Sequence, residues 1–179
     1  MEPIVSFNMS DFTLPSRADT APTAFNKNVF EVAGQAWAEA NDHIFVNSTD
    51  YSNLYWTSGI NKPSDIYESS IVSIPATNDE GLKILEKANT WSSKNGFNVK
   101  INGMARPQAV QDYMREQPSM MGIASKSSSH KTGAIDFDYI RNSGGSVNKA
   151  KTDEFKKYLK GFGYKIVEHN NHVHVSPPV

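Results

Sequence analysis

The stretch that decides the fold reads Ser129-His130-Lys131-Thr132-Gly133-Ala134-Ile135-Asp136-Phe137-Asp138. Apolar and acidic residues alternate from residue 134 to residue 139, which predicts a β-strand, because successive side chains of a strand point to opposite faces. The two acids, Asp136 and Asp138, then share one face, and the apolar side chains share the other. Gly133 allows the backbone to turn tightly between His130 and these carboxylates. The stretch therefore predicts a strand with an apolar core face and a polar face that begins beside a histidine.

A second polar strand is predicted near the C-terminus, where residues 172–174 read His-Val-His after a turn-forming Asn-Asn pair. The chain has five histidines, and three of them, His169, His172 and His174, fall within six residues. The period of two places His172 and His174 on one side of this strand. If the two polar strands are neighbours, their faces meet. One acid, His130 and one C-terminal histidine then form a three-ligand zinc site with an open position for water.

Composition narrows the possible functions. The chain of 179 residues is long enough for one good core, and its net charge of -1 makes nucleic acid a poor default partner. Without cysteines, a disulfide framework and a thiolate zinc site are both excluded, so any metal must be held by His and Asp or Glu. No run of residues approaches a membrane span, and the first residues lack the pattern of a signal peptide. We therefore expect synthesis in the cytoplasm without a cleavable leader.

The chain divides into two parts in its patterning. Residues 1–74 are polar with scattered aromatic side chains, and they are interpreted as an N-terminal extension that anchors or docks the protein, with one helix near residues 28–40. Residues 75–179 are predicted to form an α+β domain, a small and mostly antiparallel sheet flanked by helices. The elements expected in that domain are a helix from a capping box at Thr77-Asn-Asp-Glu80 to residue 95, a strand at 97–101, a short helix after Pro107, a loop at 117–132, the strand at 134–139, a helix capped by Thr152 and ended by Gly163, and strands at 164–168 and 172–176.

A zinc ion with an open position activates water and polarises a carbonyl, so amide hydrolysis is the expected use of this site. That reaction needs groups beyond the metal ligands. His172, two residues before the expected ligand His174, is the first choice for the group that handles protons, and Glu168 and His169 are second choices. Arg106 ends a strand and is expected to clamp a substrate carboxylate in two-point fashion. Ser129, Asp138 and His169 complete the residues expected to contact substrate.

The order of these motifs resembles the zinc peptidases of the D-Ala-D-Ala carboxypeptidase and murein endopeptidase superfamily, which shares its fold with the hedgehog signalling domain. Four elements of residues 75–179 carry the resemblance: a helix and strand ending in Arg-Pro, then Ser-x-His-x-x-Gly followed by Ala-Ile-Asp-Phe, then a helix closing on Gly-Phe-Gly-Tyr, and last a His-x-His-Val strand. The resemblance implies Zn²⁺ as cofactor, with His130, Asp136 and His174 as ligands. It also implies His172 for catalysis and Arg106 for substrate binding.

One departure from the family concerns the acid. The family places its aspartate seven positions after the first histidine, whereas here the acids fall six (Asp136) and eight (Asp138) positions after His130. The Ala-Ile-Asp-Phe register favours Asp136, and Asp138 remains the alternative because both acids share a face.

The sequence thus predicts a zinc metallopeptidase that hydrolyses amide bonds in peptidoglycan stem peptides or cross-links. Such an enzyme would act on the bacterial cell wall, in the periplasm or from a virion, as a phage lysin or a virion-associated wall-degrading protein. The alternative is a non-catalytic binding or structural module, including one of a virion, that keeps the peptidase fold. The shortened spacing between His130 and the acid favours that alternative.

Overall fold

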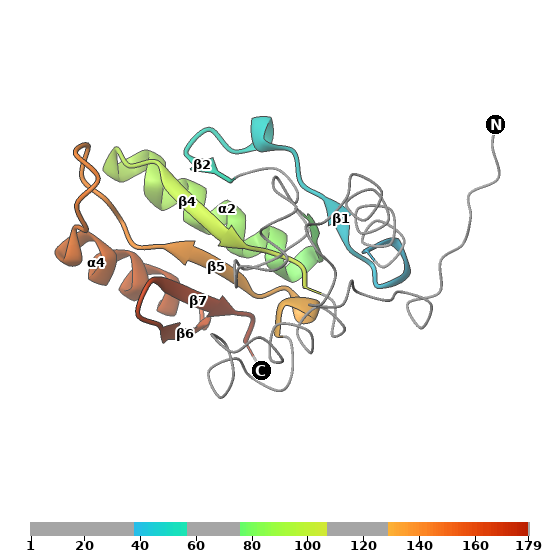
Figure 1. Cartoon of the computed structure of the whole chain (residues 1–179). Helices are drawn as coiled ribbons and strands as arrows, with labels where there is room; N and C mark the ends of the chain where they lie inside the picture. The colour runs from blue at the N-terminus through green and yellow to red at the C-terminus, as the bar shows by residue number, and fades with distance from the viewer. Residues whose placement is uncertain (1–37, 57–75, 107–128, 179) are drawn as a thin grey trace, which may run out of the picture.

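The computed structural model describes residues 38–56, 76–106 and 129–178, which form an α+β fold (Figure 1). Its main sheet has five strands in the order β2-β4-β5-β7-β6, in which β2 is parallel to β4 and every other neighbouring pair is antiparallel. The expected class and the mostly antiparallel sheet are therefore confirmed. The strand bounds are Leu54–Tyr55 for β2, Val99–Gly103 for β4, Ile135–Asp138 for β5, Lys165–Glu168 for β6 and His172–Ser176 for β7.

The first long helix, α2, spans Asp79–Asn95 and ends at Gly96, whose φ of 71° lies in the left-handed region. This span agrees with the predicted helix, but the predicted cap is wrong. Asn78 is the N-cap, and its side chain accepts a hydrogen bond from the backbone N–H of Gly81 at 3.0 Å. Thr77 instead ends the short strand β3 (Ala76–Thr77), so its backbone is already committed to a sheet.

The second long helix, α4, spans Lys149–Lys160, and its predicted limits need a similar correction. Asn148 is the N-cap, while Thr152 lies inside the first turns and is buried. The Thr152 hydroxyl donates to the carbonyl of Asn148 at 2.8 Å and accepts from the N–H of Ile140 at 3.0 Å. The helix ends before Gly163, because the chain already turns at Gly161.

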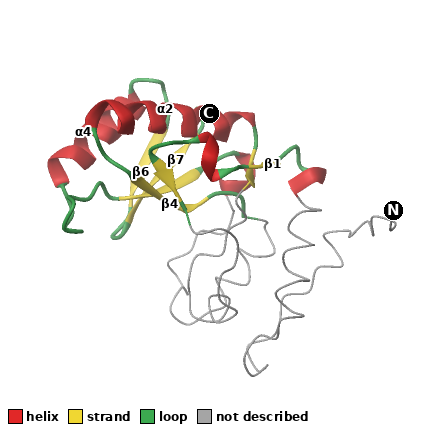
Figure 2. Ribbon diagram, turned by 90° about the horizontal axis from the view of Figure 1, so that it is seen from above, coloured by secondary structure: helices red, strands yellow, loops and turns green. Residues whose placement is uncertain are grey.

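The core lies between the two helices and one face of the sheet (Figures 1 and 2). Phe155 of α4 packs edge-on against Phe137 of β5, with ring centroids 5.4 Å apart, and also contacts Trp91 of α2 at 5.1 Å. The alternate residues of β7, Val173 and Val175, are fully buried in the same core. Because strand side chains alternate, this packing sends the histidines of β7 and the acids of β5 to the face that α2 and α4 leave uncovered.

Two short strands come from the first 74 residues. β1 (Ile44–Phe45) pairs with β3 antiparallel, and β2 adds to β4, with Leu54 buried in the core. The described part of the expected extension is thus attached to the sheet, and the boundary at residue 75 stays a prediction. Residues 38–40 are helical, while the rest of the expected helix at 28–40, the helix after Pro107 and most of the loop at 117–132 lie outside the described residues.

The last four residues of that loop form a 3₁₀ helix, η4 (Ser129–Thr132). No helix within 38–56, 76–106 and 129–178 is both long and apolar enough to cross a membrane.

Gly133 joins η4 to β5, and its φ of 99° confirms the expected tight turn. A Cβ atom there would lie 2.3 Å from Oδ1 of Asn78 and 2.9 Å from the backbone nitrogen of Gly81, so the loop presses directly on the capped start of α2. The loop that carries His130 is therefore docked on a helix terminus, and a side chain at residue 133 would push the two apart.

We predict that Gly133→Ala lowers the free energy of unfolding by about 1–3 kcal/mol from backbone strain alone, with the displaced cap adding to this loss. Urea unfolding followed by circular dichroism measures it. Gly144→Ala is the matched control, because no atom lies within 4 Å of its Cβ position and its φ is not positive. Equal unfolding midpoints for the two variants would contradict the docking of the loop on α2.

Candidate metal centre

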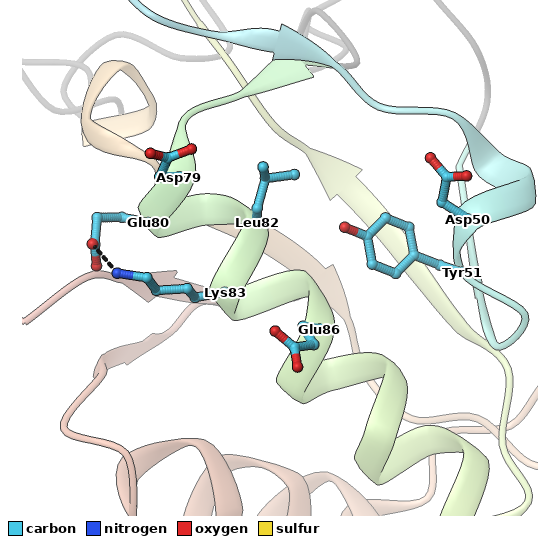
Figure 3. Close-up of a pocket in the computed structure, with 7 residues that line it drawn as sticks. All are labelled: Asp50, Tyr51, Asp79, Glu80, Leu82, Lys83 and Glu86. Atoms are coloured by element: carbon cyan, nitrogen blue, oxygen red, sulfur yellow. Dashed lines mark hydrogen bonds and ion pairs between the residues drawn. The ribbon is translucent and has the colours of Figure 1, made fainter.

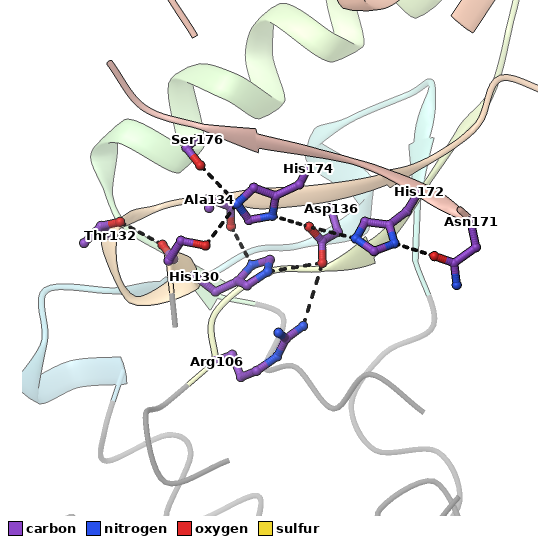
Figure 4. Close-up of polar contacts among 10 residues, drawn as sticks. Arg106, His130, Thr132, Ala134, Asp136, Asn171, His172, His174 and Ser176 are labelled. Carbon is purple, nitrogen blue, oxygen red and sulfur yellow. Dashed lines mark hydrogen bonds and ion pairs between the residues drawn. The ribbon is translucent and has the colours of Figure 1, made fainter. Parts of the chain in front are cut away.

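Three side chains from separate elements converge on the face of the sheet opposite α2 and α4: His130 from η4, Asp136 from β5 and His174 from β7 (Figure 4). The antiparallel register of β5 and β7 pairs Asp136 directly with His174, and Asp138 with His172. Each of the three residues offers one ligand atom, and these atoms lie within 4.8 Å of one another. The structure thus brings together the three residues expected as ligands, and the group can hold a metal ion.

His130 is buried and held at both ring nitrogens. Nδ1 lies 2.9 Å from the carbonyl oxygen of Ala134, and Nε2 lies 3.1 Å from Oδ2 of Asp136. Burial lowers the pKa of His130, and the nearby Asp136 offsets only part of that effect, so the neutral ring is favoured. A carbonyl oxygen can only accept, so this contact favours the tautomer with the proton on Nδ1. In that tautomer the lone pair of Nε2 faces the carboxylate.

His174 is arranged in the same way with its nitrogens exchanged. Nδ1 lies 2.6 Å from Oδ1 of Asp136, and Nε2 lies 3.0 Å from the hydroxyl oxygens of both Ser129 and Ser176. When Nε2–H donates to a serine oxygen, the lone pair of Nδ1 faces Asp136. The outer nitrogens of both rings are therefore bonded to the protein, as is usual for histidines that bind a metal through the other nitrogen.

Asp136 is only 2% exposed and lies at the centre of the group. Burial by itself raises the pKa of this carboxyl group, but His130, His174 and the Arg106 cation outweigh it and hold the pKa well below its usual range. One nitrogen of each imidazole and the ionised carboxylate thus point at a common space, and a proton on that nitrogen can bridge it to the carboxylate. With the protons on the outer nitrogens instead, the lone pairs and the carboxylate repel one another unless a cation lies between them, so in that tautomer the donor set fits a divalent metal ion.

Arg106 lies beneath the acid and is only 6% exposed. Its Nη2 is 3.7 Å from Oδ2 of Asp136, and burial lowers its pKa from the ordinary value, partly offset by that carboxylate. Gly103 pairs with Asp136 on the neighbouring strand, and a Cβ there would lie 3.2 Å from Oδ2 of Asp136 and 3.5 Å from Nη2 of Arg106. The guanidinium therefore supports the carboxylate directly, and its expected contact with substrate stays a prediction.

His172 lies at the edge of the group. Its Nε2 is 3.7 Å from Oδ1 of Asp136, and its Nδ1 is 2.6 Å from the amide oxygen of Asn171. The ring of the exposed His169 stacks on it at 4.6 Å between centroids. Burial lowers the pKa of His172, while Asp136 raises it and His169 lowers it further. His172 is thus next to the expected ligands without lying among them.

Other residues expected at the site have different places. Asp138 shares the face of Asp136, but its carboxylate is paired with Arg141 at 2.9 Å and lies outside the potential metal group. Glu168 pairs across the sheet with Val173, which points into the core, and its carboxylate forms an ion pair with Lys156 of α4. Glu168 therefore faces the helix side of the sheet, and the structure does not bring it to His172.

Sequence reasoning assigned no role to Ser176 and treated Asn171 only as a turn residue. The signal for Ser176 was present, because it follows His174 by two residues and so shares its face. Ser129 contacts His174, and its expected contact with substrate stays a prediction. The hydrogen bonds that support each histidine ring depend on which of its nitrogens faces Asp136. The spacing of residues along the sequence does not predict which nitrogen that is.

A separate hollow of about 500 Å³ lies beside α2 (Figure 3). Among the described residues that line it, Lys83 is the one cation, and it is paired with Glu80 at 2.7 Å. None of the three potential metal ligands lines this hollow, whose lining residues are Asp50, Tyr51, Asp79, Glu80, Leu82, Lys83 and Glu86.

No protein-family model matches the chain, and a search of the curated proteins finds no match either.

We predict that Asp136→Asn weakens the binding of Zn²⁺ by more than about 100-fold, which is the upper range for loss of a merely supporting partner. The neutral amide removes the negative charge and an acceptor that face both rings. Competition with a chromophoric chelator measures the affinity. Asp138→Asn is the matched control and should bind Zn²⁺ like the unaltered protein, and an equal loss in both variants would contradict the assignment of Asp136.

Proposed function

We propose that the protein is a zinc-dependent peptidase that hydrolyses amide bonds in peptidoglycan stem peptides or cross-links. The observation that carries the proposal is the convergence of two anchored imidazoles on one ionised carboxylate, with His172 beside them. The order of motifs in residues 75–179, which resembles that of murein peptidases, supports the choice of peptidoglycan. The wall of a bacterium would be the place of action, reached as a lysin or as part of a virion.

The donor set favours zinc. Catalytic zinc sites use three protein ligands drawn from His, Asp and Glu and leave a position for water, whereas structural sites are usually closed by cysteine. Zinc bound here would lower the pKa of a coordinated water to about 7 and polarise the carbonyl of the amide to be cleaved. Asp136 contributes a carboxylate that is already ionised, because His130, His174 and the buried Arg106 lower its pKa.

His172 is proposed to move the proton. Its Nδ1–H donates to Asn171, so the lone pair of Nε2 is available toward Asp136. Nε2 would accept a proton from the attacking water and return it to the nitrogen of the leaving amine. Burial keeps the ring neutral and thus ready to accept. Asp136 and His174, which sit opposite each other in the β5–β7 register, would bind the metal and take no part in this transfer.

We predict that His174→Ala abolishes stoichiometric zinc binding and activity together, because a ligand is lost. In contrast, His172→Ala should keep the zinc and lower kcat by about 10²- to 10⁴-fold, the usual contribution of a positioned acid or base. Metal content measured by mass spectrometry and turnover of the same preparations test the contrast. Loss of zinc from the His172 variant would show that His172 is a ligand.

The enzymatic claim is tested by incubating the zinc-loaded full chain with purified murein and with peptides ending in D-Ala-D-Ala. New amino groups and soluble muropeptides are expected, and a chelator should abolish their release until zinc is restored. Intact substrates in the presence of stoichiometric zinc would refute the peptidase. That result, or a protein that binds no zinc, would support the alternative of a binding or structural module.

A further inference from the structure

The turn between β6 and β7 holds His172 on two sides. The backbone N–H of His169 donates to the carbonyl of His172 at 2.9 Å and closes the hairpin, and the hydroxyl of Tyr139 donates to the carbonyl of His169. This places the side chain of Asn171 within 2.6 Å of Nδ1 of His172 (Figure 4). The ring of His169 lies on the face of the His172 ring, with an angle of 26° between the planes.

The bond to Asn171 decides which nitrogen of His172 carries the proton. A neutral imidazole exists in two tautomers, and the hydrogen bond made by one nitrogen selects between them. The amide oxygen of Asn171 can only accept, so it selects the tautomer with the proton on Nδ1. The other nitrogen, Nε2, then presents its lone pair on the side of Asp136, at 3.7 Å from Oδ1.

We propose that Asn171 is a positioning residue for His172, which holds its proton on Nδ1 and orients Nε2 toward the metal centre. This inference rests on the function proposed above for its catalytic meaning, but the tautomer itself does not depend on activity. The same arrangement recurs at His130, where the carbonyl of Ala134 holds the proton on the outer nitrogen. At His174 the serine hydroxyls occupy the corresponding place.

The consequence for catalysis is specific to proton transfer. Without Asn171, the ring of His172 would populate both tautomers, and the one with the proton on Nε2 cannot accept a proton there. The metal ligands would keep their own partners, because Asn171 contacts neither His130 nor His174 in the bonds that hold those rings. The loss should therefore appear in kcat, while zinc affinity and KM stay close to their original values.

The test uses the zinc-loaded full chain labelled with ¹⁵N-histidine, at a pH of about 8 where an ordinary imidazole is neutral. Nitrogen shifts report which nitrogen of His172 is protonated, and His172→Gln identifies its signals by their disappearance. Asn171→Ala should move His172 from the Nδ1–H form to a mixture and lower kcat by about 10- to 100-fold, the range for loss of a supporting partner. Asn171→Asp retains an acceptor oxygen and should restore the tautomer and most of the rate.

Asn170→Ala is the matched control, since Asn170 is the exposed neighbour in the same turn. An unchanged tautomer in Asn171→Ala would overturn the inference, as would an equal change in Asn170→Ala, which would point to the turn as a whole. If the unaltered protein hydrolyses nothing, the proposed function fails, and the nitrogen shifts still decide whether Asn171 sets the tautomer of His172.

Discussion

The buried carboxylate of Asp136 is the group on which the rest of the site depends. A negative charge that is 2% exposed is costly unless it is paired and hydrogen-bonded, and here His130, His174 and Arg106 surround it. Each partner comes from a different segment of the chain, so the acid ties together the loop before β5, the segment that follows β4 and the last strand. A metal ion at this place would replace the proton-mediated contacts by coordination.

The apolar side of the same strands secures this arrangement. Phe137 and Val173 are fully buried against the helices and pair with each other across the two strands. The same register places Asp136 opposite His174. A slip of one residue between β5 and β7 would expose these apolar side chains and send the polar ones into the core. The hydrophobic core therefore sets the position of the site, because only one register satisfies both faces of the sheet.

The hydrogen bonds that hold the three histidine rings come from uncharged groups. A backbone carbonyl, two serine hydroxyls and one asparagine amide hold the outer nitrogens of His130, His174 and His172. These bonds leave three inner nitrogens directed toward Asp136. Few groups balance the charge of the site. Among the described residues, Arg106 is the one arginine or lysine that forms an ion pair with Asp136.

Much of this was predictable from the chain alone. Alternation placed Asp136 and Asp138 on one strand face and His172 and His174 on another, and the helix bodies followed from apolar spacing. Helix starts were less predictable, because threonine and asparagine are both good caps. In α4, Thr152 is buried inside the helix, and Asn148 caps its N-terminus.

Local pattern thus determined which residue types face together along each strand. Only the tertiary structure decided that Asp136 and not Asp138 meets His130, that Glu168 faces α4, and that Arg106 lies buried against the acid. These choices depend on strand order, register and the path of loops between residues far apart in the chain. Periodicity describes one element at a time, whereas a site made by four segments is set by how those elements pack together.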